Sequence, residues 1–131
     1  AEQEGAAIDA FAKLGMKVAI SELDVDVLPS AFGHMTADVS AHAAADPKLN
    51  PWPNGLPDDA QKQLAARYAD LFRVFVAHKE AISRVTLWGV TDGDSWKNDW
   101  PVRGRTDYPL LFDREGQPKP AFEAVIQAAQ P

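Results

Sequence analysis

Two short apolar segments, each followed at once by polar residues, constrain the fold of this chain more than any other feature. They are Lys17–Val25 and Arg84–Val90. The first begins almost uniformly apolar, which is typical of a strand buried on both faces of a parallel sheet. Helical patterns precede, separate and follow the two segments. Strands that alternate with helices predict an α/β fold with a parallel sheet.

Three helices are expected around the strands. Residues 2–14 carry apolar side chains at the helical period and are followed by Gly15, a residue typical of a helix C-terminus. A second helix begins at residue 58 or 59 and ends between residues 78 and 81, with an apolar stripe along one side. The third covers residues 120–127 and has Pro120 near its start. The stretch between residues 28 and 57 is long and irregular, which is typical of a functional loop.

The chain is too short to complete the architecture that this order predicts. It has 131 residues, whereas a (β/α)8 barrel takes about 250 residues. Its two predicted strands are about a quarter of the barrel's strands. We therefore expect residues 1–131 to be one part of a single larger domain.

Charge and composition exclude several classes of function. Lys and Arg number 13 and Asp and Glu number 19, so the net charge is −6. This balance disfavours nucleic acid and anionic membrane surfaces, which bind basic patches. The absence of cysteine excludes disulfides, thiolate catalysis and Cys-ligated zinc. No apolar run approaches the roughly 18 residues that span a bilayer.

The chemistry-bearing residues stand at the ends of the two predicted strands. In the first, Glu22, Asp24 and Asp26 alternate with apolar residues, which predicts that the carboxylates share one face. The second strand leads into a loop that contains Trp88 and Trp96. A carboxylate beside indole rings is what a sugar-cleaving cleft needs, because flat indole faces stack on pyranose rings.

Four segments resemble a known family. Residues 19–25, AISELDV, look like the seventh barrel strand of glycoside hydrolase family 10, the retaining endo-β-1,4-xylanases. Residues 85–96, VTLWGVTDGDSW, look like its eighth strand and the following loop. Residues 103–113, RGRTDYPLLFD, and 117–122, QPKPAF, also match. The resemblance implies the C-terminal portion of a (β/α)8 TIM barrel, with strands 7 and 8 and their flanking helices.

The resemblance implies a role for each site residue. Glu22 matches the catalytic nucleophile, and Asp24 matches an acid that helps to orient the site. Trp88 and Trp96 match the tryptophans that wall the sugar subsite at the scissile bond. The substrate implied is xylan or a xylo-oligosaccharide, with no metal and no organic cofactor. Because xylan is an extracellular polymer, we expect the protein in an extracellular or periplasmic location.

The proton donor of the reaction is expected outside this chain. In the resembling family the acid/base Glu follows an Asn, but Asn50, Asn54 and Asn98 precede Pro, Gly and Asp. Residues 1–131 thus carry a nucleophile without its proton donor, and the expected partner is the N-terminal remainder of the barrel. We expect the isolated chain to be inactive and poorly folded.

Other interpretations remain open at this stage. The chain could be a non-catalytic carbohydrate-binding module or a degenerate barrel fragment. Asp24 and Trp88 could be structural, and Trp52 could be an outer sugar contact or a loop anchor. The carboxylates of the first strand could hold a hard cation, although strand-spaced acids are weak evidence for a metal site.

Further motifs carry less weight. Residues 92–96 begin like a calcium-binding loop, but Trp96 and Lys97 stand where that loop requires an oxygen ligand and a glycine. The histidines, His34, His42 and His78, are scattered and are interpreted as surface or packing residues.

Overall fold

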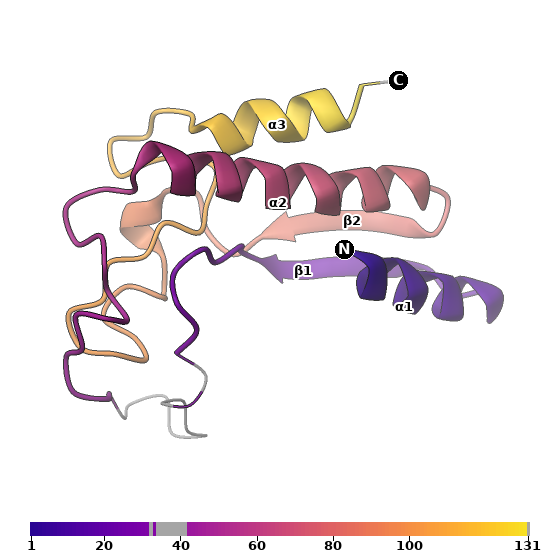
Figure 1. The fold of residues 1–131 in the computed structure, drawn as a ribbon. Coiled ribbons are helices and arrows are strands. Elements are labelled where there is room, and N and C mark those ends of the chain that lie inside the picture. The colour runs from indigo at the N-terminus through magenta and orange to yellow at the C-terminus, as the bar shows by residue number, and fades with distance from the viewer. Residues whose placement is uncertain (32, 34–41, 131) are drawn as a thin grey trace.

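The computed structural model describes residues 1–31, 33 and 42–130 and confirms the predicted order of elements. In chain order these are α1 (Glu2–Lys13), β1 (Val18–Leu23), α2 (Asp58–Ala77), β2 (Ile82–Leu87), the 3-10 turn η2 (Asp92–Asp94) and α3 (Pro120–Ala128). β1 and β2 pair in parallel, and α2 connects them (Figure 1). No helix in this described part is both long and apolar enough to cross a membrane.

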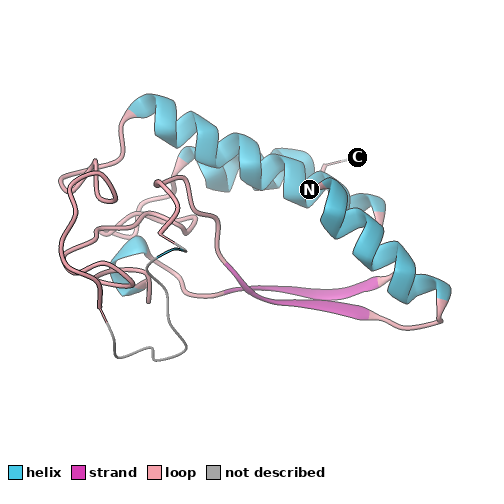
Figure 2. Ribbon diagram, turned by 60° about the horizontal axis from the view of Figure 1, so that its bottom comes forward, coloured by secondary structure: helices cyan, strands magenta, loops and turns pink. Residues whose placement is uncertain are grey.

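The helices form a layer on one side of the strand pair. Figures 1 and 2 show α2 running above β1 and β2, with α3 packed along α2. α1 contacts α2 and β1. Gly5 lies at this contact, where an added Cβ would be 3.4 Å from Val74 Cγ1, an ordinary van der Waals distance. His78 strengthens the same junction, because its Nε2 lies 3.2 Å from the carboxylate of Asp9.

The hydrophobic core lies between α2, α3 and the segments that follow the strands. Leu64 and Tyr68 of α2 are fully buried, and Ala121 of α3 packs in the same cluster. The Tyr68 hydroxyl donates a 2.6 Å hydrogen bond to the carbonyl of Pro109, which satisfies this buried polar group. Burial raises the pKa of Tyr68, so the hydroxyl keeps its proton and remains a donor.

The prediction that the first strand is buried on both faces is wrong for the described chain. In β1, Val18, Ile20 and Leu23 are half-buried, whereas Ala19 and Ser21 are exposed. The helices cover one face of the strand pair (Figure 2), and no described element covers the other. Strand residues without a second covering layer stay in contact with solvent.

Both strands end earlier than predicted. β1 ends at Leu23, and β2 ends at Leu87. The register of the pair shifts between Ile20 and Leu23, and Glu22 has a φ of 58°. This left-handed backbone interrupts the regular alternation of the strand, but Glu22 and Asp24 still line one cavity, and Asp24 and Asp26 line another.

A buried ion pair ties the loop after β2 to the segment before α3. Lys119 Nζ lies 2.8 Å from Asp92 Oδ2, and it also donates to the carbonyls of Tyr108 and Leu110. Asp92 Oδ1 accepts the backbone N–H of Leu110 at 2.9 Å. Burial raises the pKa of Asp92 and lowers the pKa of Lys119, while their mutual attraction opposes both shifts. The pair holds the loop in place over the core.

Candidate functional site

The residues predicted from the sequence to form a site lie together. Glu22, Asp24, Trp88 and Trp96 line one cavity of about 240 Å³ beyond the C-terminal ends of the strands. The first two come from the end of β1 and the segment after it, and the tryptophans come from the segment after β2. Function in parallel α/β barrels is found at this end of the strands.

Glu22 is an exposed carboxylate on an unusual backbone. Its φ of 58° is in the left-handed region, which costs a non-glycine residue about 1–2 kcal/mol. The conformation coincides with the register shift between β1 and β2. Backbone strain of this kind is concentrated at functional sites, where surrounding structure maintains it.

Trp88 is positioned by its backbone and by the glycine that follows it. The backbone N–H of Trp88 donates a 2.9 Å hydrogen bond to the carbonyl of Leu23, and the Trp88 side chain is 46% exposed. Gly89 has a φ of 141°, and an added Cβ would lie 2.7 Å from Leu110 Cδ1. Any larger residue would have to displace Leu110, so glycine lets the chain turn here and presents the Trp88 ring at the cavity.

Trp96 is held by Asp24. The indole Nε1 donates a 2.8 Å hydrogen bond to Asp24 Oδ2, and Lys97 Nζ lies 3.4 Å from Asp24 Oδ1. Both oxygens of Asp24 are therefore engaged, and its side chain is largely buried. Asp24 is thus in direct contact with the indole of Trp96, which itself remains 44% exposed.

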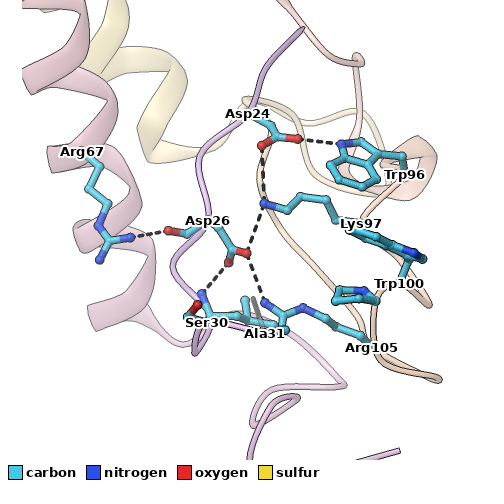
Figure 3. Close-up of a pocket in the computed structure, with 11 residues that line it drawn as sticks. Asp24, Asp26, Ser30, Ala31, Arg67, Trp96, Lys97, Trp100 and Arg105 are labelled. Atoms are coloured by element: carbon cyan, nitrogen blue, oxygen red, sulfur yellow. Dashed lines mark hydrogen bonds and ion pairs between the residues drawn. The ribbon is translucent and has the colours of Figure 1, made fainter. Parts of the chain in front are cut away.

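A larger cavity of about 540 Å³ adjoins the first and shares Asp24 and Trp96 with it (Figure 3). Its volume falls within the range of small-molecule sites, about 300–1,000 Å³. Figure 3 shows that Asp24 contacts Trp96 and Lys97 and that Asp26 contacts Lys97 and Arg105 at the border of this space.

An ion network fixes the walls of the larger cavity. Lys97 Nζ and Arg105 Nη2 each lie 3.1 Å from Asp26 Oδ2, and Arg105 Nε lies 3.2 Å from Asp107 Oδ2. Arg105 also donates to two main-chain carbonyls of the loop after β1. Burial raises the pKa of Asp107, and the negative charge of Asp26 adds to this shift. Arg67 of α2 donates to the main-chain carbonyl of Asp26.

Sequence reasoning did not identify Lys97, Trp100 or Arg105 as members of the site. Lys97 and Trp100 stand in a polar loop rich in tryptophan, and that composition was a usable signal. Arg105 stands in a family-like segment, but no spacing rule predicts that it meets Asp26, from which 79 positions separate it.

The weaker candidates contact other parts of the protein where the structure describes them. His34 lies outside the described residues. His42 Nδ1 lies 3.4 Å from Asp99, and His78 joins α2 to α1. Trp52 packs against the core, and its backbone carbonyl accepts a hydrogen bond from the Tyr108 hydroxyl. These contacts favour the interpretation of Trp52 as a loop anchor.

No metal site is evident in the part of the chain that the structure describes, where no three or more His, Asp or Glu side chains gather to hold an ion. Asp92 is paired with Lys119, and Asp94 accepts a 2.8 Å hydrogen bond from the Thr91 hydroxyl. The acids of the calcium-like stretch are thus used within the protein.

Known proteins resemble this chain in sequence and in structure. The chain is 42% identical over 120 residues to endo-1,4-beta-xylanase A of Xylanibacter ruminicola, covering 92% of this chain and 32% of that protein. A GH10 endoxylanase from a sugarcane soil metagenome has 44% identity and a TM-score of 0.88, over 96% of this chain and 36% of that one.

A substituted variant solved in complex with xylotriose has 35% identity and a TM-score of 0.75, over 95% of this chain and 33% of that one. This chain therefore spans about a third of the length of the relatives that it matches. Its parallel strand pair and helices correspond to one part of the (β/α)8 barrel in those structures. The sequence profile of Glycosyl hydrolase family 10 matches residues 1–128, and the chain belongs to that family.

Proposed function

We propose that this chain supplies the nucleophile-bearing part of a retaining endo-1,4-β-xylanase. The observation that carries the proposal is the cavity in which the exposed carboxylate of Glu22 lies with two half-exposed indoles, Trp88 and Trp96. The relatives are endo-1,4-β-xylanases, and one related structure contains xylotriose. The substrate proposed is xylan or a xylo-oligosaccharide.

The proposed reaction has two displacements. The Glu22 carboxylate attacks the anomeric carbon, the glycosidic C–O bond breaks, and an acid protonates the departing sugar oxygen. The product of this step is a covalent ester between Glu22 and the sugar. Water then attacks the same carbon, gives a proton to the carboxylate that had served as acid, and releases Glu22.

The tryptophans are proposed to hold the reacting sugar. Flat indole faces can cover the C–H faces of a pyranose. Because the indoles of Trp88 and Trp96 are exposed, a sugar in the cavity can reach them. The hydrogen bond from Trp96 to Asp24 sets the orientation of one ring. Because Asp24 acts through Trp96, we assign it a positioning role.

The acid/base carboxyl is proposed to come from outside residues 1–131. A retaining enzyme needs two carboxyl groups about 5–5.5 Å apart. The Asp24 carboxylate accepts a hydrogen bond from Trp96 and pairs with Lys97, and the Asp26 carboxylate pairs with Lys97 and Arg105. Both carboxylates are therefore occupied by contacts within this chain. The remaining strands of the barrel would supply the missing carboxyl.

The surface of the chain supports such a partner. Among the described elements, β1 pairs only with β2, which leaves its other edge free to extend the sheet. Large apolar side chains are also exposed, including Leu14, Met16 and Val90. We expect residues 1–131 alone to be inactive and poorly folded. Since the substrate is a polymer outside cells, we propose an extracellular or periplasmic location.

The test uses a complete barrel that contains residues 1–131, with Glu22→Gln beside the unchanged protein. We expect the substitution to lower kcat on xylan by at least about 10³-fold, because no covalent intermediate can form. Glu80→Gln, which removes an exposed carboxylate at the opposite end of the strands, is the matched control and should leave kcat unchanged.

A second measurement identifies the nucleophile directly. An activated 2-deoxy-2-fluoro xylobioside should leave one glycosyl group on the peptide that contains Glu22, visible as a mass shift. Full activity of the Glu22→Gln protein, or a label on another peptide, would refute the assignment. Binding of xylotriose without cleavage by the unchanged barrel would instead support the non-catalytic alternative.

A further inference from the structure

Lys119 is a buried lysine that the proposed reaction does not use. Its side chain is 3% exposed, and Nζ lies 2.8 Å from Asp92 Oδ2 and from the main-chain carbonyls of Tyr108 and Leu110. An ammonium group has three N–H donors, so each donor of Lys119 has an acceptor. A charge buried this deeply is tolerated only when it is paired and hydrogen-bonded. Two of the three bonds hold one short segment, residues 108–110.

Residues 108–110 form a buried strap, and the ion pair holds the strap at its last residue, Leu110, from two directions. Asp92 Oδ1 accepts the Leu110 N–H at 2.9 Å, while Lys119 Nζ donates to the Leu110 carbonyl. The side chain of Leu110 is fully buried. Because its N–H, its carbonyl and its side chain are all constrained, Leu110 has a fixed position in the fold.

The strap contacts both segments that carry the proposed active site. On one side, the Pro109 carbonyl accepts the backbone N–H of Val25, in the segment after β1, at 3.2 Å. On the other side, Leu110 Cδ1 lies so close to Gly89 that an added Cβ there would be 2.7 Å away, and Gly89 directly follows Trp88. The strap therefore fixes the segment after β1 and the segment of Trp88 relative to each other.

We propose that Lys119 is a positioning residue of the active site, which holds the strap and thereby sets the position of Trp88 at the Glu22 cavity. Lys119 acts on the sugar only through Leu110 and the turn at Gly89. If the strap moves, this turn loses its support and the indole ring loses its fixed direction. The proposal rests on the xylanase function, because that function assigns Trp88 to the reacting sugar.

The experiment compares the unchanged complete barrel with the double variant Asp92→Asn/Lys119→Met. Methionine is unbranched like lysine but has no ammonium group, and asparagine removes the charge that would otherwise be buried without a partner. Asparagine can still accept the Leu110 N–H, so the variant chiefly loses the two bonds from Lys119 to the strap. We expect kcat/KM on xylohexaose to fall by about 10–100-fold, because a shift of about 1 Å in a substrate-holding group has an effect of this size.

The same double change in a Trp88→Ala background shows whether the loss passes through Trp88. There we expect kcat/KM to change by less than about twofold, because the ring that would be displaced is absent. Ile8→Ala is the control for general destabilisation, since Ile8 is buried in α1, which contacts α2 and β1. It should lower Tm and leave kcat/KM unchanged at a temperature well below Tm.

The outcomes separate positioning from a purely structural role. A loss of equal size with and without Trp88 would overturn the proposal, and so would an unchanged kcat/KM. Leu110→Ala breaks the same route at the Gly89 contact, so its loss should show the same dependence on Trp88. This variant decides the question if the double variant does not fold.

A failure of the proposed function is distinguishable from a failure of this inference. If the unchanged barrel cleaves no xylan, the proposed function fails by itself. Crystal structures of the unchanged barrel and of Asp92→Asn/Lys119→Met then decide the role of Lys119. A displaced Trp88 ring in the variant supports the proposal, and a ring in the same place overturns it.

Discussion

The indole N–H of Trp96 donates to Asp24 Oδ2 at 2.8 Å, across a separation of 72 positions in the sequence. This bond joins the segment after β1 to the segment after β2 at the edge of the cavity that contains Glu22. It gives the exposed Trp96 ring a defined direction. Lys97 balances the charge of Asp24 from the other side.

Asp24 and Trp96 should therefore behave as one unit in catalysis. In a complete barrel, we expect Asp24→Ala and Trp96→Phe each to lower kcat/KM on xylo-oligosaccharides by about 10–100-fold. The double variant should be little worse than the poorer single variant, because both changes remove the same hydrogen bond. A double-mutant cycle measures this coupling.

The matched control pairs Asp24→Ala with Trp52→Phe, which lies away from the cavity. The effects of these two substitutions on kcat/KM should be additive when expressed as free energies. If the Asp24 and Trp96 variants also add, the hydrogen bond does not contribute to catalysis.

Gly89 should tolerate no side chain. Alanine there meets Leu110 Cδ1 at 2.7 Å and must adopt a φ of 141°. We expect Gly89→Ala to lower the free energy of unfolding by about 2–4 kcal/mol, the combined cost of overpacking and backbone strain. Urea unfolding of the complete barrel measures the change.

Gly104 provides the comparison for the backbone alone. Its φ is 76°, and an added Cβ has nothing within 4 Å, so Gly104→Ala should cost only about 1 kcal/mol. Equal costs at the two positions would show that the contact with Leu110 is unimportant. Leu110→Ala in the Gly89→Ala background should change stability less than it does alone.

Asp107 should make stability depend on pH in a defined direction. Burial raises its pKa above the value of about 3.9 expected in the unfolded chain. Between that value and its raised pKa, the folded protein binds more protons than the unfolded protein. The free energy of unfolding contributed by Asp107 therefore falls as the pH rises through this window.

The measurement compares urea unfolding of the unchanged barrel and Asp107→Asn at a series of pH values from 4 upward. Asparagine does not titrate, so the difference in unfolding free energy between the two proteins should shift in favour of Asp107→Asn as the pH increases. A difference that stays constant with pH would contradict the raised pKa.

The element order was predictable from the sequence because it depends on local periodicity. The apolar stripe from Leu64 onward predicted α2, and the two apolar runs predicted a parallel strand pair, as observed. The site candidates were predictable for a related reason. Glu22 and Trp88 stand beside strand ends, and the ends of parallel strands meet at one edge.

The finer geometry depends on contacts between distant segments. The left-handed backbone of Glu22 accompanies a register shift in the pairing of β1 with β2. The approach of Arg105 to Asp26 requires two loops to meet over the core. No pattern within either segment encodes such contacts, because they arise only when the strands pair and the loops pack together.

The sequence by itself thus determined the α/β class, the helix and strand order and the carboxylate and indoles of the proposed site. Only the tertiary structure decided that Asp24 holds Trp96 and that the buried indole N–H of Trp100 has no acceptor among the described residues. The physical reason is that secondary structure follows from short-range periodicity. Hydrogen-bond partners and burial follow from how segments many residues apart pack against one another.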